Sequence, residues 1–274
     1  MCQTCGCGSD DVTIDGATMH AGSDHAHDHD HGHEHDHEHG LDHSHHRDAM
    51  PAHGRTVSLE QDVLAKNQLL AERNRGWFAG REVFAVNLMS SPGAGKPSIL
   101  ERTIRDLREE IPISVLEGDQ ATLVDAERIR ATGAAAVQIN TGTGCHLDAH
   151  MVAHGIDRLS MARGSILLIE NVGNLVCPAL FDLGEHARVV VVSVTEGDDK
   201  PLKYPHLFRA GHLLLINKRD LLPYVRFDVE RCIDNARRIN PELQVLLLSA
   251  ETGEGMPAWY DWLRMRGVPV PGPV

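Results

Sequence analysis

The sequence predicts an α/β fold, a mostly parallel sheet with helices on both faces, preceded by a tail that we expect to be disordered. Three observations carry this prediction. From residue 83 onward short apolar runs alternate with helical stretches, a glycine-rich loop follows the first run, and the first 54 residues contain few apolar side chains. Such alternation is typical of parallel strands joined by covering helices. We therefore divide the chain into a tail, residues 1–54, and one folded domain, residues 55–274.

The tail is rich in side chains that bind metals. Three thiols, Cys2, Cys5 and Cys7, fall within six positions, and histidines then alternate with mostly acidic residues. These histidines are His25, His27, His29, His31, His33, His35, His37 and His39. Thiolate and imidazole suit borderline divalent metals such as zinc, nickel and copper. A purification tag would be contiguous histidine, and a neutral linker needs no cysteine cluster, so we expect the tail to capture or store metal ions.

Composition argues against several classes of function. The formal charge is −13 over 274 residues, and about −10 of it precedes residue 54. No basic patch with interleaved aromatic residues favours nucleic acid, and no stretch has the length and apolarity of a membrane span. The N-terminus does not read as a signal peptide, and the six cysteines do not form a secreted disulfide framework. We expect a cytoplasmic protein with reduced thiols that binds neither nucleic acid nor membrane.

The first expected element of the domain is a helix. Ser58-Leu59-Glu60-Gln61 forms a capping box, in which the serine and glutamine side chains satisfy the first backbone N–H groups of a helix. An apolar stripe follows at helical spacing, and the helix is expected to end near Gly76. The stripe consists of Leu59, Val63, Leu64, Leu69 and Leu70. This helix is interpreted as a packing element that leads into the sheet.

Strands and helices then alternate along the rest of the chain. Strands are expected at residues 83–89, 113–117, 135–139, 166–170, 189–194, 213–217 and 245–249. Helices are expected at residues 98–110, 123–131, 147–160, 228–239 and 257–266. Ligands of such folds bind at the carboxyl ends of the strands, so the residues that follow each strand are the candidates for function.

A phosphate-binding loop follows the first strand. Residues 90–98 read Ser-Ser-Pro-Gly-Ala-Gly-Lys-Pro-Ser and open a helix. Backbone N–H groups of Gly93, Ala94 and Gly95 can surround phosphates, and Lys96 can reach the terminal phosphate. Pro97 departs from the usual pattern, because it replaces a hydroxyl that should bind magnesium and also lacks an N–H. Ser98 offers a hydroxyl one position later, which could substitute in part.

A second motif indicates that the base is guanine. Asn217-Lys218-Arg219-Asp220 follows a strand far along the sheet, and the Asp220 carboxylate can accept hydrogen bonds from the ring N–H and exocyclic amine of guanine. Adenine lacks that pair of donors and would leave the carboxylate unpaired. Alone the tetrapeptide is a weak signal, but together with a phosphate loop it predicts GTP and GDP as ligands. Ser249 and Ala250, after the last strand, fit the loop that backs the base.

Carboxylates follow two further strands. Glu117-Gly118-Asp119 ends one strand, and Glu170-Asn171-Val172-Gly173 ends another. A carboxylate at either place could hold magnesium through water or position the attacking water. The second segment resembles the γ-phosphate-sensing segment of GTPases with glutamate in place of aspartate. We therefore predict Lys96, Asp119 and Glu170 as the catalytic residues.

The remaining cysteines lie near these segments. Cys145 and His146 follow a strand, and Cys177 lies four residues after Gly173. An isolated cysteine is usually a packing residue, but an adjacent Cys-His pair and a third thiol beside the switch segments favour a second metal site. Cys232, on an expected helix, is interpreted as a packing residue.

Together these motifs resemble the hydrogenase nickel-incorporation GTPases, the HypB family, within the metallochaperone GTPases that include the urease accessory protein. The resemblance covers essentially the whole chain. Its motifs are MCxxCGC, the histidine-rich tail, SSPGAGK, EGDQ, GTGCHLDA, ENVGNLVCP, EGDDKPLKYP and NKRD. The MCxxCGC start, and Gly-Cys-His with a downstream Cys-Pro, are the specific elements; the urease relative would be expected to show Cys-Pro-His instead.

The resemblance implies a GTP-dependent homodimer that delivers nickel to the large-subunit precursor of a nickel-iron hydrogenase, together with other hydrogenase maturation proteins. It implies a tight nickel site made of Cys2, Cys5 and Cys7. It also implies a weaker site, for nickel or zinc, at the dimer interface, made of Cys145, His146 and Cys177. Lys200 and Lys203 lie in one of the shared motifs, but no motif mechanics assign them a role.

The expected mechanism is a switch. GTP and magnesium order the loops at Asp119 and at residues 170–173, and hydrolysis then relaxes Cys145 and Cys177 and releases the metal. Hydrolysis should be slow, because no arginine finger is evident. The alternative is a nickel storage protein whose GTP site is catalytically impaired, which the tail and Pro97 favour. The intact Lys96 and Asp220 motifs favour the switch.

Overall fold

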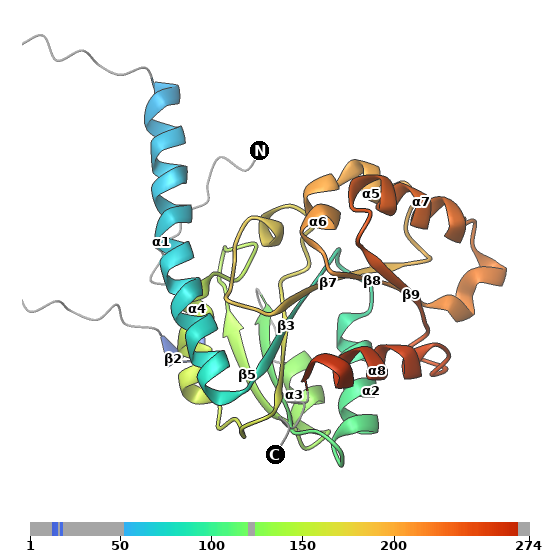
Figure 1. The fold of residues 1–274 in the computed structure, drawn as a ribbon, viewed down its shortest axis with the longest axis horizontal. Helices are drawn as coiled ribbons and strands as arrows, with labels where there is room; N and C mark the ends of the chain where they lie inside the picture. The colour runs from blue at the N-terminus through green and yellow to red at the C-terminus, as the bar shows by residue number, and fades with distance from the viewer. Residues whose placement is uncertain (1–12, 16, 19–51, 120–123, 268–274) are drawn as a thin grey trace, which may run out of the picture.

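The computed structural model describes residues 13–15, 17–18, 52–119 and 124–267 (Figure 1). Its centre is a sheet of nine strands in the order β2-β1-β5-β4-β6-β3-β7-β8-β9. The seven strands from β5 to β9 in that order pair with one another in parallel, so the predicted α/β class with a mostly parallel sheet is confirmed. Cys2, Cys5, Cys7 and the alternating histidines lie outside the described residues.

The seven parallel strands lie within two residues of the expected ranges. They are β3 (Phe84–Ser90), β4 (Ile113–Asp119), β5 (Ala135–Asn140), β6 (Ile166–Glu170), β7 (Ala187–Ser193), β8 (Leu213–Asn217) and β9 (Gln244–Leu247). Five of them, β3, β4, β6, β7 and β8, consist mostly of buried residues, which explains the apolar runs in the sequence.

Helices cover both faces of the sheet, as Figure 1 shows. One face packs against α2 (Lys96–Leu107), α3 (Val124–Arg130) and α8 (Met256–Gly267). The opposite face packs against α1 (Ala52–Arg81) and α4 (Ala149–Arg158) at one end and α6 (Pro205–Ala210) and α7 (Val229–Ile239) at the other. The shorter helices are α5 (Lys200–Lys203), η1 (Cys177–Ala179) and η2 (Arg219–Tyr224).

Neighbouring residues of one strand enter different cores. Val86 and Leu88 of β3 join the core under α2 and α8, whereas Ala85 joins the core under α1 and α4. This division follows from the two-residue period of a strand, which points successive side chains to opposite faces. The sheet is therefore buried on both sides, and its edge at the strand ends is left for ligands.

Helix α1 is longer than the sequence predicts. It begins at Ala52 and ends at Arg81, so Ser58 does not cap it and Gly76 does not end it. Phe78, two residues after Gly76, is completely buried against the sheet. Burial of a phenylalanine contributes about 1.5–3 kcal/mol, which exceeds the cost of about 1 kcal/mol for a glycine inside a helix. The burial of Phe78 therefore outweighs the tendency of Gly76 to end the helix.

A small hairpin from the N-terminal segment extends the sheet. Strands β1 (Thr13–Ile14) and β2 (Ala17–Thr18) pair antiparallel, and β1 pairs with β5. Ile14 is buried, and the Arg158 guanidinium donates to its carbonyl oxygen at 2.9 Å. The sequence did not predict this hairpin, which comes from ahead of the expected boundary at residue 54. Among the described helices, none is both long enough and apolar enough to cross a bilayer.

Candidate functional site

The phosphate loop joins β3 to α2 at the carboxyl edge of the sheet. Gly95 caps the helix with a φ of 95°, and Lys96 is the first helical residue. A Cβ atom on Gly95 would lie 2.5 Å from the side-chain nitrogen of Asn217. Glycine is therefore required at this position both by the backbone angle and by the close approach of the second nucleotide motif.

Lys96 is held inside the loop. Its ammonium group is buried, donates a hydrogen bond to Ser90 Oγ at 2.7 Å and lies 4.0 Å from Glu170 Oε1. Ser90 occupies the position where the usual loop pattern has glycine. Its hydroxyl accepts the lysine and in turn donates to the Ser91 carbonyl at 2.7 Å. The serine therefore positions Lys96, a role that the sequence did not reveal.

The second nucleotide motif contacts the phosphate loop directly. Asn217 Nδ2 donates to the Ala94 carbonyl at 3.0 Å, and Asn217 Oδ1 accepts the Ala250 N–H at 3.2 Å. Lys218, in the left-handed region with a φ of 62°, donates to the Gly93 carbonyl at 2.8 Å. Asn217 thus joins two loops that are far apart in the sequence.

Asp220 lies beside the loop after β9. Ser249 Oγ donates to Asp220 Oδ1 at 2.5 Å, which orients the carboxylate. The structure therefore brings all the nucleotide-binding residues predicted from the sequence to one edge of the sheet. Their contact with guanine nucleotide stays a prediction.

The carboxyl edge of the sheet offers carboxylate ligands for magnesium, but the phosphate loop lacks the hydroxyl that usually binds this ion. Pro97 lies in the first turn of α2, where proline is tolerated, and the Ser98 side chain after it is exposed. Glu170 and Asp119 end β6 and β4, and both strands end at the loop edge. Carboxylate oxygens suit magnesium, so the residues present fit the ion, with one ligand fewer than the usual loop supplies.

Cys145, His146 and Cys177 come together. One potential ligand atom from each lies within 4.8 Å of the other two, and Cys145 Sγ is 3.7 Å from His146 Nδ1. Metal bonds of about 2.3 Å to sulfur and 2.0–2.1 Å to nitrogen at a tetrahedral angle give a separation of about 3.6 Å. Burial lowers the pKa of His146, although nearby Asp148 raises it, so the ring favours its neutral, metal-binding form.

The metal cluster and the phosphate loop are joined through Asn171. Asn171 Oδ1 accepts the N–H of Leu147 at 3.1 Å, directly after the Cys-His pair, and the N–H of Val172 at 3.0 Å. Two residues further on, Gly173 passes so close to the loop that an added Cβ would lie 3.1 Å from the Pro92 nitrogen. Residues 170–177 therefore contact the phosphate loop and carry a ligand of the cluster. This role of Asn171 is not evident from the sequence.

A further contact of the phosphate loop involves Lys200. Ser91 Oγ donates to Glu196 Oε2 at 2.6 Å, and the Lys200 ammonium lies 2.7 Å from the same oxygen. Lys203 instead pairs with Asp199 on the surface. The two lysines that share one motif therefore differ, because only Lys200 is linked to the loop.

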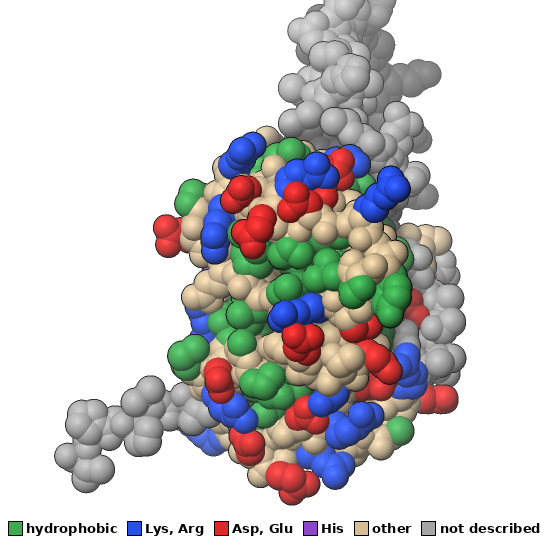
Figure 2. All heavy atoms as spheres, turned by 90° about the vertical axis from the view of Figure 1, so that its right-hand side faces the viewer, with side chains coloured by type: hydrophobic (Ala, Val, Ile, Leu, Met, Phe, Trp, Pro, Cys, Tyr) green, Lys and Arg blue, Asp and Glu red, His purple; other side chains and the backbone are tan. Residues whose placement is uncertain are grey.

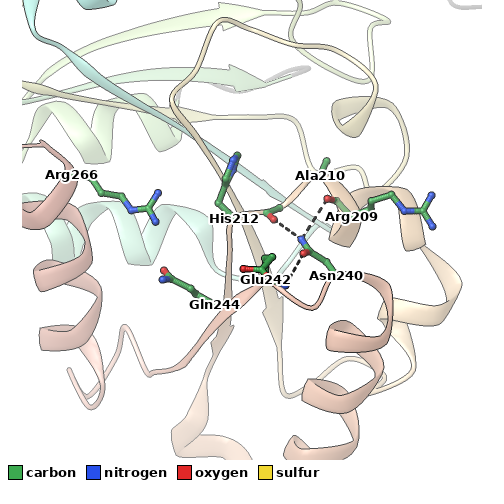
Figure 3. Close-up of a pocket in the computed structure, with 8 residues that line it drawn as sticks. Arg209, Ala210, His212, Asn240, Glu242, Gln244 and Arg266 are labelled. Atoms are coloured by element: carbon green, nitrogen blue, oxygen red, sulfur yellow. Dashed lines mark hydrogen bonds between the residues drawn. The ribbon is translucent and has the colours of Figure 1, made fainter.

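Two other features are separate from this site. Cys232 is completely buried in an apolar core and burial raises its pKa to about 12, which confirms it as a packing residue. Figure 3 shows a polar pocket, about 400 Å³ in volume, where Asn240 donates to the Gly211 carbonyl at 2.8 Å. Its residues His212 and Gln244 lie at the amino ends of β8 and β9. It therefore lies at the edge opposite the nucleotide motifs.

The surface on the right of Figure 1 carries both signs of charge. Figure 2 shows this face, where Lys and Arg side chains are interspersed with Asp and Glu side chains and with apolar ones. Nucleic-acid binding depends on concentrated positive charge. This face does not gather such charge.

Comparison with known proteins agrees with these motifs. A family model described as the CobW/HypB/UreG nucleotide-binding domain matches residues 84–247. The hydrogenase maturation factor HypB of Escherichia coli strain K12 is 58% identical over 209 residues, which cover 76% of this chain and 72% of that protein. The same factor from Rhizobium leguminosarum bv. viciae is 59% identical over 211 residues, covering 77% and 71%.

Solved structures also show similarity to HypB proteins. The crystal structure of HypB from Archaeoglobus fulgidus superposes with a TM-score of 0.70 at 45% identity and covers 74% of this chain and 99% of that one. HypB from Helicobacter pylori, solved in complex with nickel, gives a TM-score of 0.71 at 35% identity, covering 74% and 95%. The chain therefore belongs to the CobW/HypB/UreG family of nucleotide-binding proteins and, within it, to the HypB proteins.

Proposed function

We propose that this chain is a GTP-hydrolysing nickel metallochaperone that stores nickel and delivers it during maturation of nickel-iron hydrogenase. One observation carries the proposal. Residues 170–177 contact the phosphate loop at Pro92, hold the Cys145–His146 segment through Asn171, and supply Cys177 to the metal cluster. A change at the γ-phosphate can therefore reach the metal ligands along a single segment.

The proposed roles of the nucleotide-binding residues follow from their positions at the carboxyl edge of the sheet. Backbone N–H groups of residues 93–95 bind phosphate, Asp220 reads guanine, and Lys96 leaves Ser90 to contact the terminal phosphates. Asp119 and Glu170 would hold magnesium, which neutralises phosphate charge when bound. Water then attacks the γ-phosphorus, the bond to the β,γ-bridging oxygen breaks, and GDP and phosphate leave. Without the hydroxyl that Pro97 replaces, we expect slow turnover.

Nickel is the cargo. Cys145, His146 and Cys177 supply three ligands, which leaves a fourth position for water, a partner ligand or an exchange reaction. Zinc suits the same donors, so either metal is expected to bind. HypB from Helicobacter pylori is a relative that was solved in complex with nickel. Cys2, Cys5 and Cys7 are proposed as the tighter nickel site.

The switch step uses the segment around Asn171. When GTP binds, Glu170 and Gly173 draw toward the phosphate loop, and Asn171 carries the Leu147 backbone with them. Because Leu147 follows His146 directly, the Cys-His pair shifts relative to Cys177. Hydrolysis reverses the shift and changes the metal geometry.

Dimerisation has a matching surface. Val176 and Leu180 flank the Cys177 segment, and each is 54% exposed. Two exposed apolar side chains beside a three-ligand metal site favour an interface at which a second copy covers both. We propose a GTP-dependent homodimer that acts in the cytoplasm on the hydrogenase large-subunit precursor, with other hydrogenase maturation proteins.

The test is nickel retention by the full-length protein in chelator-buffered nickel, with GDP or with a non-hydrolysable GTP analogue and magnesium. We expect retention at the cluster to differ at least about fivefold between the two nucleotides. Cys177→Ala should remove this difference while GTP hydrolysis continues at the wild-type rate. Equal retention in both nucleotide states, with no turnover, would instead support a storage protein with an impaired GTP site.

A further inference from the structure

Helix α1 carries two buried asparagines on the face that packs against the rest of the protein. Asn67 and Asn74 are seven residues apart, which places them on the same side of the helix. Figure 1 shows this helix alongside α4. Alanine or leucine favours a helix more than asparagine does, and a buried amide costs free energy unless its hydrogen bonds are made. Two asparagines on a packed face therefore indicate specific partners.

Both asparagines contact the same two segments. Asn67 Oδ1 accepts the N–H of Ala149 at 2.9 Å, and Asn67 Nδ2 donates to the Asp182 carbonyl at 2.8 Å. Asn74 Nδ2 donates to the Ala149 carbonyl at 2.8 Å and to the Leu183 carbonyl at 3.0 Å. Each asparagine therefore joins the first residue of α4 to the loop that precedes β7.

These two segments also carry the ligands of the metal cluster. Ala149 follows His146 by three residues, and Asp182 follows Cys177 by five. Phe181, directly before Asp182, stacks on the His146 ring with the ring centroids 3.9 Å apart and an angle of 29° between the planes. The loop that α1 holds therefore also contacts a ligand from the other segment.

We propose that Asn67 and Asn74 are positioning residues that set the metal affinity of the cluster formed by Cys145, His146 and Cys177. By holding both segments against one helix, they keep the three ligand atoms within 4.8 Å of one another before the ion arrives. Ligands that are already in place lose less conformational freedom when metal binds, so the affinity is higher. The proposal rests on the metal cluster of the proposed function.

This constraint differs from the connection through Asn171. The hydrogen bonds from α1 reach residues 149, 182 and 183, which lie outside the segment 170–177 that contacts the phosphate loop. Loss of these bonds should therefore lower the metal affinity by the same factor with GDP and with a GTP analogue. Loss of Asn171 should instead change the ratio between the two nucleotide states.

Site-resolved alkylation tests the proposal in the full-length protein. Nickel is the probe, its free concentration is fixed by a chelator buffer, and iodoacetamide modifies free thiols faster than metal-bound ones. Peptide mass spectrometry reports Cys145 separately from the thiols of the tail. Asn235→Ala is the matched control, because Asn235 is also buried and donates to the Asp198 carbonyl at 3.4 Å from α7. The GDP affinity of each variant reports whether the nucleotide site is intact.

We expect Asn67→Ala and Asn74→Ala each to raise the nickel concentration that half-protects Cys145 about tenfold, the lower end of the usual effect of residues that orient metal ligands. The GDP affinity and the protection of the tail thiols should not change. Asn67→Leu fills a similar volume but cannot form the hydrogen bonds, so it should lose as much nickel affinity as Asn67→Ala. Asn235→Ala should keep the wild-type value.

Several outcomes would overturn the positioning role. These are unchanged half-protection of Cys145 in both alanine variants, wild-type nickel affinity in Asn67→Leu, an equal loss in Asn235→Ala, or a loss of GDP affinity that matches the loss of nickel affinity. Failure of nickel to protect Cys145 in the wild type is a different result. It would remove the metal cluster itself, and the proposed function would then fail together with this inference.

Discussion

The nucleotide loop and the metal cluster are assembled in different ways. In the loop, Lys96 and Asn217 are held by other residues of the nucleotide motifs, at 2.7 and 3.0 Å. The cluster takes Cys145 and His146 from one segment and Cys177 from another, and these segments are joined through a residue that is not a ligand, Asn171. The loop is therefore preformed, whereas the cluster depends on the position of residues 170–177.

This difference makes the coupling depend on bound metal. Without metal, loss of a cluster ligand should leave nucleotide affinity nearly unchanged, because Lys96 and Asn217 are held within the nucleotide motifs. With metal bound, nucleotide should alter metal affinity and metal should alter nucleotide affinity by the same factor, because residues 170–177 take part in both regions. The four changes below test the loop, its magnesium position, the connecting residue and the cluster, in order of decreasing expected effect.

The largest effect is expected at Asp220. Asp220→Ala removes the acceptor for guanine, so the preference for GTP over ATP should fall by about a hundredfold or more. Competition binding with the two nucleotides measures the preference. Asp261→Ala, which removes an exposed carboxylate on α8, is the matched control and should change nothing. An unchanged preference in Asp220→Ala would mean that the base is read elsewhere.

Pro97 should have the next largest effect. Pro97→Thr restores both a magnesium ligand and a backbone N–H, and a hydrogen bond to a charged group is worth about 1.5–3 kcal/mol. GTP turnover should therefore rise about ten- to a hundredfold, and GTP-dependent dimerisation should strengthen, without a change in nickel binding at Cys2, Cys5 and Cys7. Phosphate release measures the turnover. If the variant is no faster, Ser98 already serves the ion.

Asn171 tests the connection between the regions. Asn171→Ala should remove most of the nucleotide effect on nickel retention, about tenfold if the coupling has the usual size. The matched control is Asn67→Ala, because Asn67 is also buried and its Oδ1 accepts the Ala149 N–H at 2.9 Å, two residues after the Asn171 contact. Both variants lose comparable packing. Equal loss of coupling in both would show that stability, not the Asn171 contact, carries the effect.

The preformed loop could be predicted from the sequence, whereas the connection could not. Each nucleotide motif is a short contiguous segment after a strand, and the parallel topology places such segments at one edge. Asn171 works through contacts with Leu147 and Asn87, which are far away in the sequence and leave no local pattern. The link from Ser91 through Glu196 to Lys200 was missed for the same reason.

The errors in the predicted fold also come from contacts between residues that are far apart in the sequence. The end of α1 was placed at Gly76 because local propensity was the only signal available, and burial of Phe78 decided otherwise. Strands β1 and β2 have two residues each, which is too short to show a period of two. β1 pairs with β5 and β2 pairs with β1, and the sequence of the hairpin does not reveal β5 as the partner.

The smallest effect concerns His146 in metal-free protein. Burial lowers its pKa, so the ring should titrate below the ordinary value of about 6.5. Because the unfolded chain then binds the proton more readily, this residue's contribution to stability is present above pH 6.5 and is lost as the pH falls through the folded pKa. Ring NMR signals measure the titration, and denaturant unfolding at several pH values measures the stability. His146→Gln should remove this part of the acid dependence. A midpoint above 6.5 would mean that Asp148, not burial, controls the ring, and the cluster would then lose metal to protons at a higher pH than we expect.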